Sequence, residues 1–262
     1  MKIIGILNIT PDSFSDGGKF NDRESALRQV KNLVDQGADI IDVGAESTRP
    51  GAQVLSYQQE WQRLESILSY VIDYARTNNV EVSLDSYHPE NIAKGLDLGI
   101  DYINDVSAAQ NEEIIQLASE SGCKLVLNHN LGIPADKTKL VDPRVDIIKY
   151  LNDWYELKLE KFTSKGVDRN KIILDVGIGF GKSSKQSFEV LERIEELKSL
   201  GCELYVGHSR KSFLADFDKY HFFKNEFVNL NGSKDYLTDV LTKYLSDKID
   251  YVRVHDVKLA KS

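Results

Sequence analysis

The sequence predicts a single (β/α)₈ barrel, and three observations carry this prediction. Short apolar, β-rich runs alternate with amphipathic helical segments along the whole chain, which indicates a parallel sheet with right-handed crossovers. Eight such units fit the 262 residues, whereas a doubly wound sheet would usually have fewer strands. No linker, charge block or longer internal repeat interrupts the pattern. We therefore expect residues 1–262 to form one barrel domain.

The expected strands are short runs of β-branched and other apolar residues. They cover residues 3–7, 40–43, 82–84, 102–103, 124–127, 172–174, 203–206 and 251–254. Apolar residues at helical spacing lie between them and predict helices over 22–36, 57–78, 89–98, 114–121, 145–165, 188–197 and 236–244. Asn21 and Glu24 have the spacing of a capping box, and Gly37 marks the end of the first helix.

Two parts of the chain depart from the regular repeat. The connection over residues 207–233 is long and rich in aromatic residues, which fits either an added helix packed on the barrel or an aromatic substrate pocket. After the eighth strand, Asp256 to Ser262 are seven residues, fewer than a typical helix of about 11. We therefore expect the eighth outer helix to be missing or very short.

Composition narrows the class of protein. The 33 basic and 41 acidic residues give a net charge of 33 − 41 = −8, which argues against a general nucleic-acid or anionic-membrane surface. Cys123 and Cys202 lack metal-site or redox-motif spacing and are expected to be reduced, buried thiols. No apolar stretch has the length of a signal peptide or a membrane span. The expected location is the cytoplasm.

Polar residues follow every predicted strand, where the carboxyl ends of barrel strands carry the chemistry. Any one of them can be read as the N-cap of the next helix. Together, Asp85, Asn104, Asp175 and Lys211 suit an amino-pyrimidine ring, because a carboxylate accepts two neighbouring N–H groups while Lys and Asn serve ring nitrogen and carbonyl. A separate cationic set suits phosphate or carboxylate and comprises Arg49, Arg253 and His255.

The glycine-rich segment 177–183 invites a phosphate-loop interpretation but fails it. The Walker spacing needs glycine at Val176, and the dinucleotide fingerprint needs glycine at Lys182. We instead expect these glycines to let the backbone pass beneath a flat ligand, with Phe180 beside it. No Gly-x-Ser-x-Gly segment supports a serine hydrolase.

Six segments closely resemble the dihydropteroate synthase family, in order from residue 3 to residue 257. They are GILNITPDSFSDGG at 5–18, ESTRPG at 46–51, NDVS at 104–107, GIGFGK at 177–182, SRKSF at 209–213 and RVHDV at 253–257. The resemblance implies a pterin-binding barrel that joins 6-hydroxymethyl-7,8-dihydropterin diphosphate to 4-aminobenzoate and releases pyrophosphate. Sulfonamides are then expected to compete as aminobenzoate mimics. It also implies a homodimer, whereas a short final helix would count against that assembly.

The resemblance assigns roles to matching residues. The expected catalytic residues are Asp85, Asp175, Lys211, Arg253 and His255, and Asn8 is expected to help bind Mg²⁺ on the diphosphate. The expected substrate-binding residues are Phe14, Thr48, Arg49, Pro50, Asn104, Asn128, Phe180, Gly179, Gly207 and Ser212.

Some positions depart from the family pattern. Asn128 stands where an apolar Met is typical beneath the pterin, Val176 replaces a usual Pro, and His208 is unusual before Ser209. Two alternatives therefore stay open: a pterin-binding methyltransferase-type barrel, and a non-catalytic pterin-binding protein derived from the synthase.

Overall fold

The computed structural model describes residues 1–9, 18–48, 51–136, 138–220 and 232–261, with side chains of the first helix described from residue 24. Its sheet closes in chain order from β1 to β8, and every neighbouring pair of strands is parallel. The strands are β1 Lys2–Asn8, β2 Ile40–Gly44, β3 Glu81–Asp85, β4 Tyr102–Asp105, β5 Lys124–Asn128, β6 Ile172–Asp175, β7 Glu203–Val206 and β8 Tyr251–Val254. The predicted barrel is confirmed, and all eight strands lie where expected.

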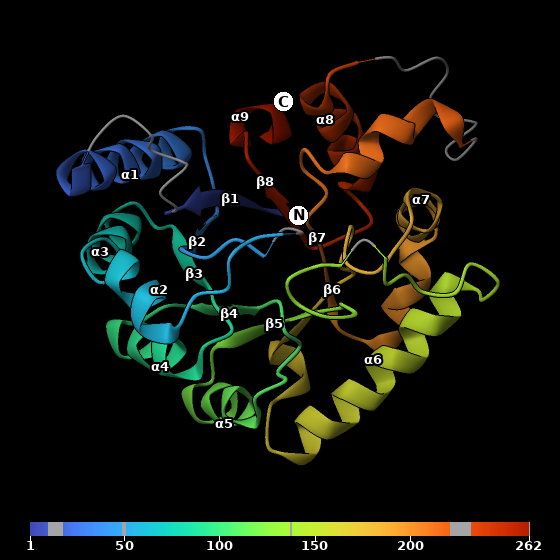
Figure 1. Ribbon diagram of the computed structural model, residues 1–262, viewed down its shortest axis with the longest axis horizontal. Helices are drawn as coiled ribbons and strands as arrows, with labels where there is room; N and C mark the ends of the chain where they lie inside the picture. The colour runs from blue at the N-terminus through green and yellow to red at the C-terminus, as the bar shows by residue number, and fades with distance from the viewer. Residues whose placement is uncertain (10–17, 49–50, 137, 221–231, 262) are drawn as a thin grey trace.

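Helices surround the ring of strands (Figure 1). They are α1 Gly18–Asp35, α2 Tyr57–Leu64, α3 Leu68–Thr77, α4 Pro89–Leu98, α5 Glu112–Ser121, α6 Ile147–Ser164, α7 Ser184–Glu192, α8 Lys234–Leu245 and α9 Val257–Lys261. Helix α9 has five residues and lies beside α8, as the short final segment predicts. Its buried Val257 packs against β1, so even this short helix covers part of the barrel.

Three helix predictions were wrong in detail. The helix expected over 57–78 is two helices, because the Ile67 N–H bonds the Leu64 carbonyl and the tighter turn redirects the chain. The helix expected over 188–197 ends at Glu192 and continues as a 3-10 helix, Ile194–Leu200. Helix α1 begins at Gly18, so Asn21 lies within it and does not cap it.

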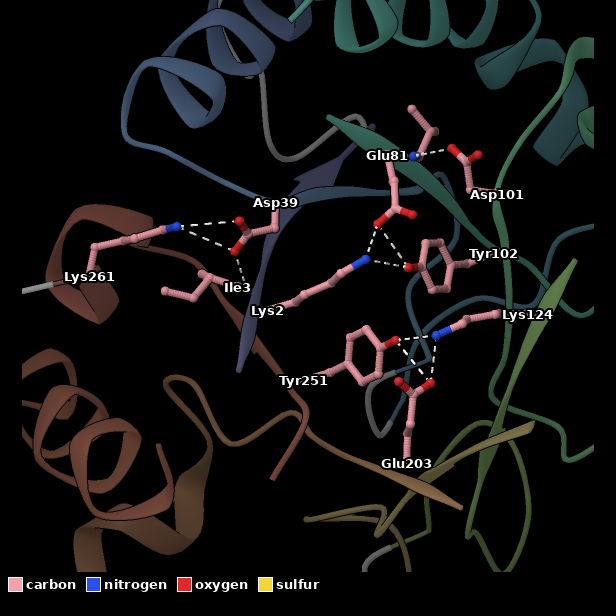
Figure 2. Close-up of polar contacts among 11 residues, drawn as sticks. Lys2, Ile3, Asp39, Glu81, Asp101, Tyr102, Lys124, Glu203, Tyr251 and Lys261 are labelled. Carbon is pink, nitrogen blue, oxygen red and sulfur yellow. Dashed lines mark hydrogen bonds and ion pairs between the residues drawn. The ribbon is translucent and has the colours of Figure 1, made fainter. Parts of the chain in front are cut away.

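The amino end of the barrel is closed by two matching polar groups (Figure 2). Lys2 of β1 donates to Glu81 of β3 at 2.5 Å, and Glu81 also accepts from Tyr102 of β4 at 2.9 Å. Four strands further on, the corresponding group comprises Lys124 of β5, Glu203 of β7 and Tyr251 of β8, with the Lys124–Glu203 contact at 2.6 Å. The two half-barrels thus place the same residue types at equivalent strands.

The long connection after β7 contains a 3-10 helix, Ser212–Lys219, which packs on α7. Phe213 and Phe217 are buried, and their rings lie 4.9 and 5.6 Å from that of Phe188. For these two residues the packing interpretation is therefore correct, and Phe222, Phe223 and Phe227 lie outside the described residues. Across the described part of the chain, no helix combines the length and apolar character needed to cross a membrane.

Candidate functional site

The polar strand ends lie on inward-facing positions at the carboxyl end of the barrel. Side chains alternate along a strand, so every second residue points into the barrel. The strand register places Asn8, Gly44, Asp85 and Asn104 side by side across β1 to β4. Asn128 and Asp175 are likewise register partners on β5 and β6. The structure thus gathers the predicted residues around one mouth.

A carboxylate that the sequence analysis did not single out connects part of this mouth. Asp42 on β2 is fully buried and accepts hydrogen bonds from Asn104 Nδ2 at 3.2 and 3.1 Å. Arg253 Nε donates to the same carboxylate at 2.6 Å, and Arg253 Nη2 donates to Asp85 at 2.9 Å. The sequence does hold a signal for Asp42, because it is a charged residue at an inward position within the apolar run 40–43.

This arrangement joins Arg253 to the carboxylates of the mouth, while the anion site expected of Arg49, Arg253 and His255 stays a prediction. Arg253 was grouped with Arg49 and His255 as an anion site, but its guanidinium is bonded to two carboxylates. The physical reason is that the half-buried arginine makes charge-assisted hydrogen bonds both to the buried Asp42 and to the half-buried Asp85. Burial and the nearby charge of Asp42 raise the pKa of Asp85, while the charge of Arg253 opposes that rise.

Asp175 is held from both sides. Its Oδ1 accepts the Gly177 N–H at 2.9 Å, and its Oδ2 accepts Asn128 Nδ2 at 2.7 Å. Burial raises the pKa of Asp175, and the positive charge of Lys211 opposes this most strongly. Asn128 thus holds the carboxylate in place from the neighbouring strand β5.

Lys211 lies close to the aromatic and glycine-rich wall of the site. Its Nζ donates to the Ile178 carbonyl and lies 5.1 Å from the centre of the Phe180 ring, within cation–π range. Burial lowers the pKa of Lys211 to about 8, against the favourable charge of Asp175. Gly179 has φ +84°, and a Cβ there would lie 3.5 Å from Lys211 Cδ. Lys211 is therefore a neighbour of both the Phe180 ring and the Asp175 carboxylate.

The remaining predicted residues lie at the rim or outside the description. His255 Nδ1 is 3.0 Å from the Ser209 hydroxyl. Gly207 is buried, and a Cβ there would make only ordinary van der Waals contacts, the nearest at 3.8 Å. Thr48 is half-buried and accepts the Ala135 N–H at 3.1 Å, while Ser212 is exposed at the start of the 3-10 helix. Phe14, Arg49 and Pro50 lie outside the described residues.

The base of the loop that follows β2 is anchored by a carboxylate the sequence analysis did not weigh separately. Glu46 accepts the Tyr87 hydroxyl at 2.5 Å and the Leu55 N–H at 3.0 Å. His88 Nε2 lies 3.3 Å from the other oxygen, and this contact raises the pKa of His88. The loop base is thus fixed to the end of β3, next to Asp85.

Comparison with known proteins identifies the family of the chain. Residues 4–255 match the model of the family described as pterin binding enzyme. The chain belongs to the pterin-binding enzyme family. This pterin-binding enzyme is 36% identical to a dihydropteroate synthase of Clostridium beijerinckii over 97% of this chain and 88% of that protein.

Two further relatives of the chain also have dihydropteroate synthase in their names. A probable bifunctional folylpolyglutamate synthase/dihydropteroate synthase of Haloferax volcanii is 40% identical over 81% of this chain, which spans only 25% of that longer protein. The structure of the Anaplasma phagocytophilum dihydropteroate synthase with bound 6-hydroxymethylpterin-monophosphate matches with a TM-score of 0.87 and 37% identity. That match covers 99% of this chain and 95% of the Anaplasma chain.

Proposed function

We propose that this chain catalyses the dihydropteroate synthase reaction. The pterin methylene carbon loses its bond to the diphosphate oxygen and gains a bond to the nitrogen of 4-aminobenzoate, while that nitrogen loses a proton. The observation that carries the proposal is Asp175, with one hydrogen bond to each oxygen, near the positive charge of Lys211 and the Phe180 ring. This set suits the amino-pyrimidine edge of a pterin, whose neighbouring N–H groups need a fixed carboxylate.

The residues of the site support this reaction in distinct ways. A carboxylate near the dihydropterin ring favours the positive charge that builds on the methylene as the leaving group departs. Asn104 and Asp42 set the floor of the mouth, and their hydrogen bonds restrict how the ring can sit. An ordered site also holds the weakly nucleophilic aryl amine in line with the exposed carbon. No covalent enzyme intermediate is required.

We propose that Asn8 helps to hold Mg²⁺. Its amide oxygen is a hard donor at the carboxyl end of β1, in register with Gly44, and Mg²⁺ commonly combines few protein ligands with substrate phosphates. Among the described residues no group of three or more His, Cys, Asp or Glu side chains is arranged to hold a metal ion, which fits a metal held largely by the diphosphate. When bound, Mg²⁺ would neutralise charge on the leaving diphosphate.

One assay tests the proposal. Purified protein is incubated with the pterin diphosphate, Mg²⁺ and 4-aminobenzoate, and pyrophosphate and dihydropteroate are measured. We expect both products to depend on 4-aminobenzoate. Binding of pterin without such product would instead support a non-catalytic pterin-binding protein. Transfer of a methyl group from a methylated pterin would support the methyltransferase alternative.

We further propose a cytoplasmic location, supported by two free, half-buried thiols at Cys123 and Cys202. Detection of the native protein in the cytosolic fraction of its cells tests this. The homodimer implied by the resemblance stays a prediction, which sedimentation of the purified protein checks.

A further inference from the structure

Lys182 is a buried cation that the proposed chemistry does not use. It ends the glycine-rich segment after β6, and the residue is only 6% exposed. Its Nζ lies 2.7 Å from His129 Nδ1 and donates to the carbonyls of Gly177 at 3.1 Å and Phe180 at 3.3 Å. All three acceptors are uncharged, so burial lowers the pKa of Lys182 to about 7. A buried lysine without an ion-pair partner is costly, whereas an apolar residue would fill the same space without that cost.

Residues that accept hydrogen bonds from Lys182 belong to the same segments that hold Asp175 in place. Gly177, whose carbonyl accepts from Lys182, donates its own N–H to Asp175 Oδ1 at 2.9 Å. His129 donates its backbone N–H to the Asp175 carbonyl at 3.0 Å, and the preceding residue, Asn128, donates to Oδ2. Lys182 therefore ties together the ends of β5 and β6 behind the carboxylate.

His129 is suited to serve as a neutral acceptor. When Lys182 is protonated, its ammonium only donates, so His129 Nδ1 accepts and the imidazole proton lies on Nε2. Burial and the charge of Lys182 lower the pKa of His129 well below its usual value, so the ring stays uncharged. Nε2 has no hydrogen-bond partner among the described residues, but the ring stands edge-on to Trp154 at 4.8 Å and Tyr150 at 5.6 Å. Aromatic faces are weak acceptors for such an N–H.

The same lysine also acts on the aromatic wall. The carbonyl of Phe180 accepts from Lys182 on one side, while the Phe180 ring lies beneath Lys211 on the other. The backbone between them contains Gly177 and Gly179 in left-handed conformations that few other residues adopt. Lys182 adds three bonds to those that already shape this segment, such as the bond from the Phe180 N–H to the Gly177 carbonyl at 2.9 Å.

We propose that Lys182 is a positioning residue for the pterin site, which fixes the Asp175 carboxylate and the Phe180 ring through Gly177 and His129. The inference rests on the proposed function, because it concerns the pterin substrate. Removing the positive charge of Lys182 raises the pKa of Asp175 further, since that charge now lowers it. Asp175 then needs a higher pH to ionise.

Two variants separate the hydrogen bonds of Lys182 from its charge. Lys182→Met removes both, and Lys182→Gln keeps donors for the two carbonyls but no charge. Lys185→Met is the matched control, because Lys185 lies three residues further on, on α7, and is exposed. We measure kcat/KM for each substrate from about pH 5 to about pH 9, binding of 6-hydroxymethylpterin alone by calorimetry, and thermal unfolding.

For Lys182→Met we expect pterin affinity to fall by about tenfold or more and the KM for 4-aminobenzoate to change less than about twofold. The acid limb of kcat/KM for the pterin should move to higher pH. Lys182→Gln should recover part of the affinity but keep the shifted limb, and Lys185→Met should match the wild type.

Three results would overturn the inference: unchanged pterin binding and pH profile in Lys182→Met, equal losses for both substrates, or failure of both Lys182 variants to fold. A purely structural lysine would lower the unfolding temperature without moving the acid limb. If the wild-type protein binds pterin but releases no pyrophosphate, the proposed function fails. The pH dependence of pterin binding in the variants then still tests Lys182.

Discussion

Arg253 of β8 and Asp42 of β2 form an ion pair at 2.6 Å. Their strands are not neighbours, since β1 lies between them. The pair crosses the floor of the site, and Arg253 extends the connection to Asp85 at 2.9 Å. The same ion pair thus links two strands of the closed barrel and forms part of the site. A change at this pair should be felt in both stability and ligand binding.

We expect Asp42→Ala to lower the free energy of unfolding by about 3 kcal/mol, since removing one partner of a buried ion pair leaves the other uncompensated. Arg253 keeps Asp85 and is 22% exposed at its side chain, which limits the loss. Urea denaturation measures it. Asp153→Ala removes an exposed partner of Lys149 and should change stability by less than about 0.5 kcal/mol. Equal effects of the two changes would contradict a structural role for the Asp42 pair.

We expect Asp175→Asn and Lys211→Ala each to lower turnover by more than tenfold, or about 1.4 kcal/mol of barrier. In Asp175→Asn the amide has only one oxygen, so it cannot accept both neighbouring N–H groups of a pterin as the carboxylate does. Lys211→Ala removes the cation beside the Phe180 ring. Steady-state kinetics at saturating 4-aminobenzoate provide the measurement. Asp153→Asn is the control. Near-normal rates in both variants would mean that the pterin binds elsewhere.

We expect Gly177→Ala to disturb the site far more than Gly201→Ala. Both glycines have positive φ, +61° and +67°, so the backbone strain is similar and costs about 1–2 kcal/mol. At Gly177, however, a Cβ would lie 1.9 Å from the His129 carbonyl, whereas at Gly201 no atom of the described residues lies within 4 Å of it. Pterin binding should fall only in Gly177→Ala. Similar binding in the two variants would show that this close approach does not shape the site.

We expect stability to fall as the pH drops below 6.5, in part because of His208. This residue is fully buried, and its Nε2 lies 3.0 Å from the Thr238 carbonyl. Burial lowers the pKa of His208 from 6.5 to about 4, so between these values the unfolded state binds the proton and the folded state does not. The lost stability grows to roughly 3 kcal/mol at pH 4.

Comparing urea unfolding of the wild type and His208→Leu at pH 7 and pH 5 isolates this contribution, because other titrating groups are common to both. The stability of His208→Leu should depend less on pH in this interval. An identical pH dependence would show that the imidazole of His208 does not titrate as its burial implies.

We expect Glu81→Gln and Glu203→Gln to lower stability by similar amounts, about 0.5–1 kcal/mol, without changing catalysis. The two residues hold equivalent places in the groups that close the amino end of the barrel (Figure 2). That end lies opposite the mouth that carries the site, and in such barrels it serves stability. Unfolding and pterin KM are measured on the same preparations. A raised KM in either variant would contradict the separation of the two ends.

The sequence by itself determined the repeated βα unit and the polar residues at the strand ends. Both are local: period-2 and helical apolar patterns fix the elements, and closure in chain order then brings all carboxyl ends to one face. Hence Asp85, Asn104, Asp175 and Lys211 were predicted, and the structure places them around one mouth.

Only the tertiary structure decided which charges meet. Arg253 appears as a free cation in the sequence, but closure of the barrel places it against Asp42 and Asp85, 211 and 168 residues away. Lys182 looks like the end of a glycine loop until folding buries it beside His129, 53 residues distant. The physical reason is that burial and pairing energies depend on distances in space, which closure of the barrel sets and local pattern does not encode.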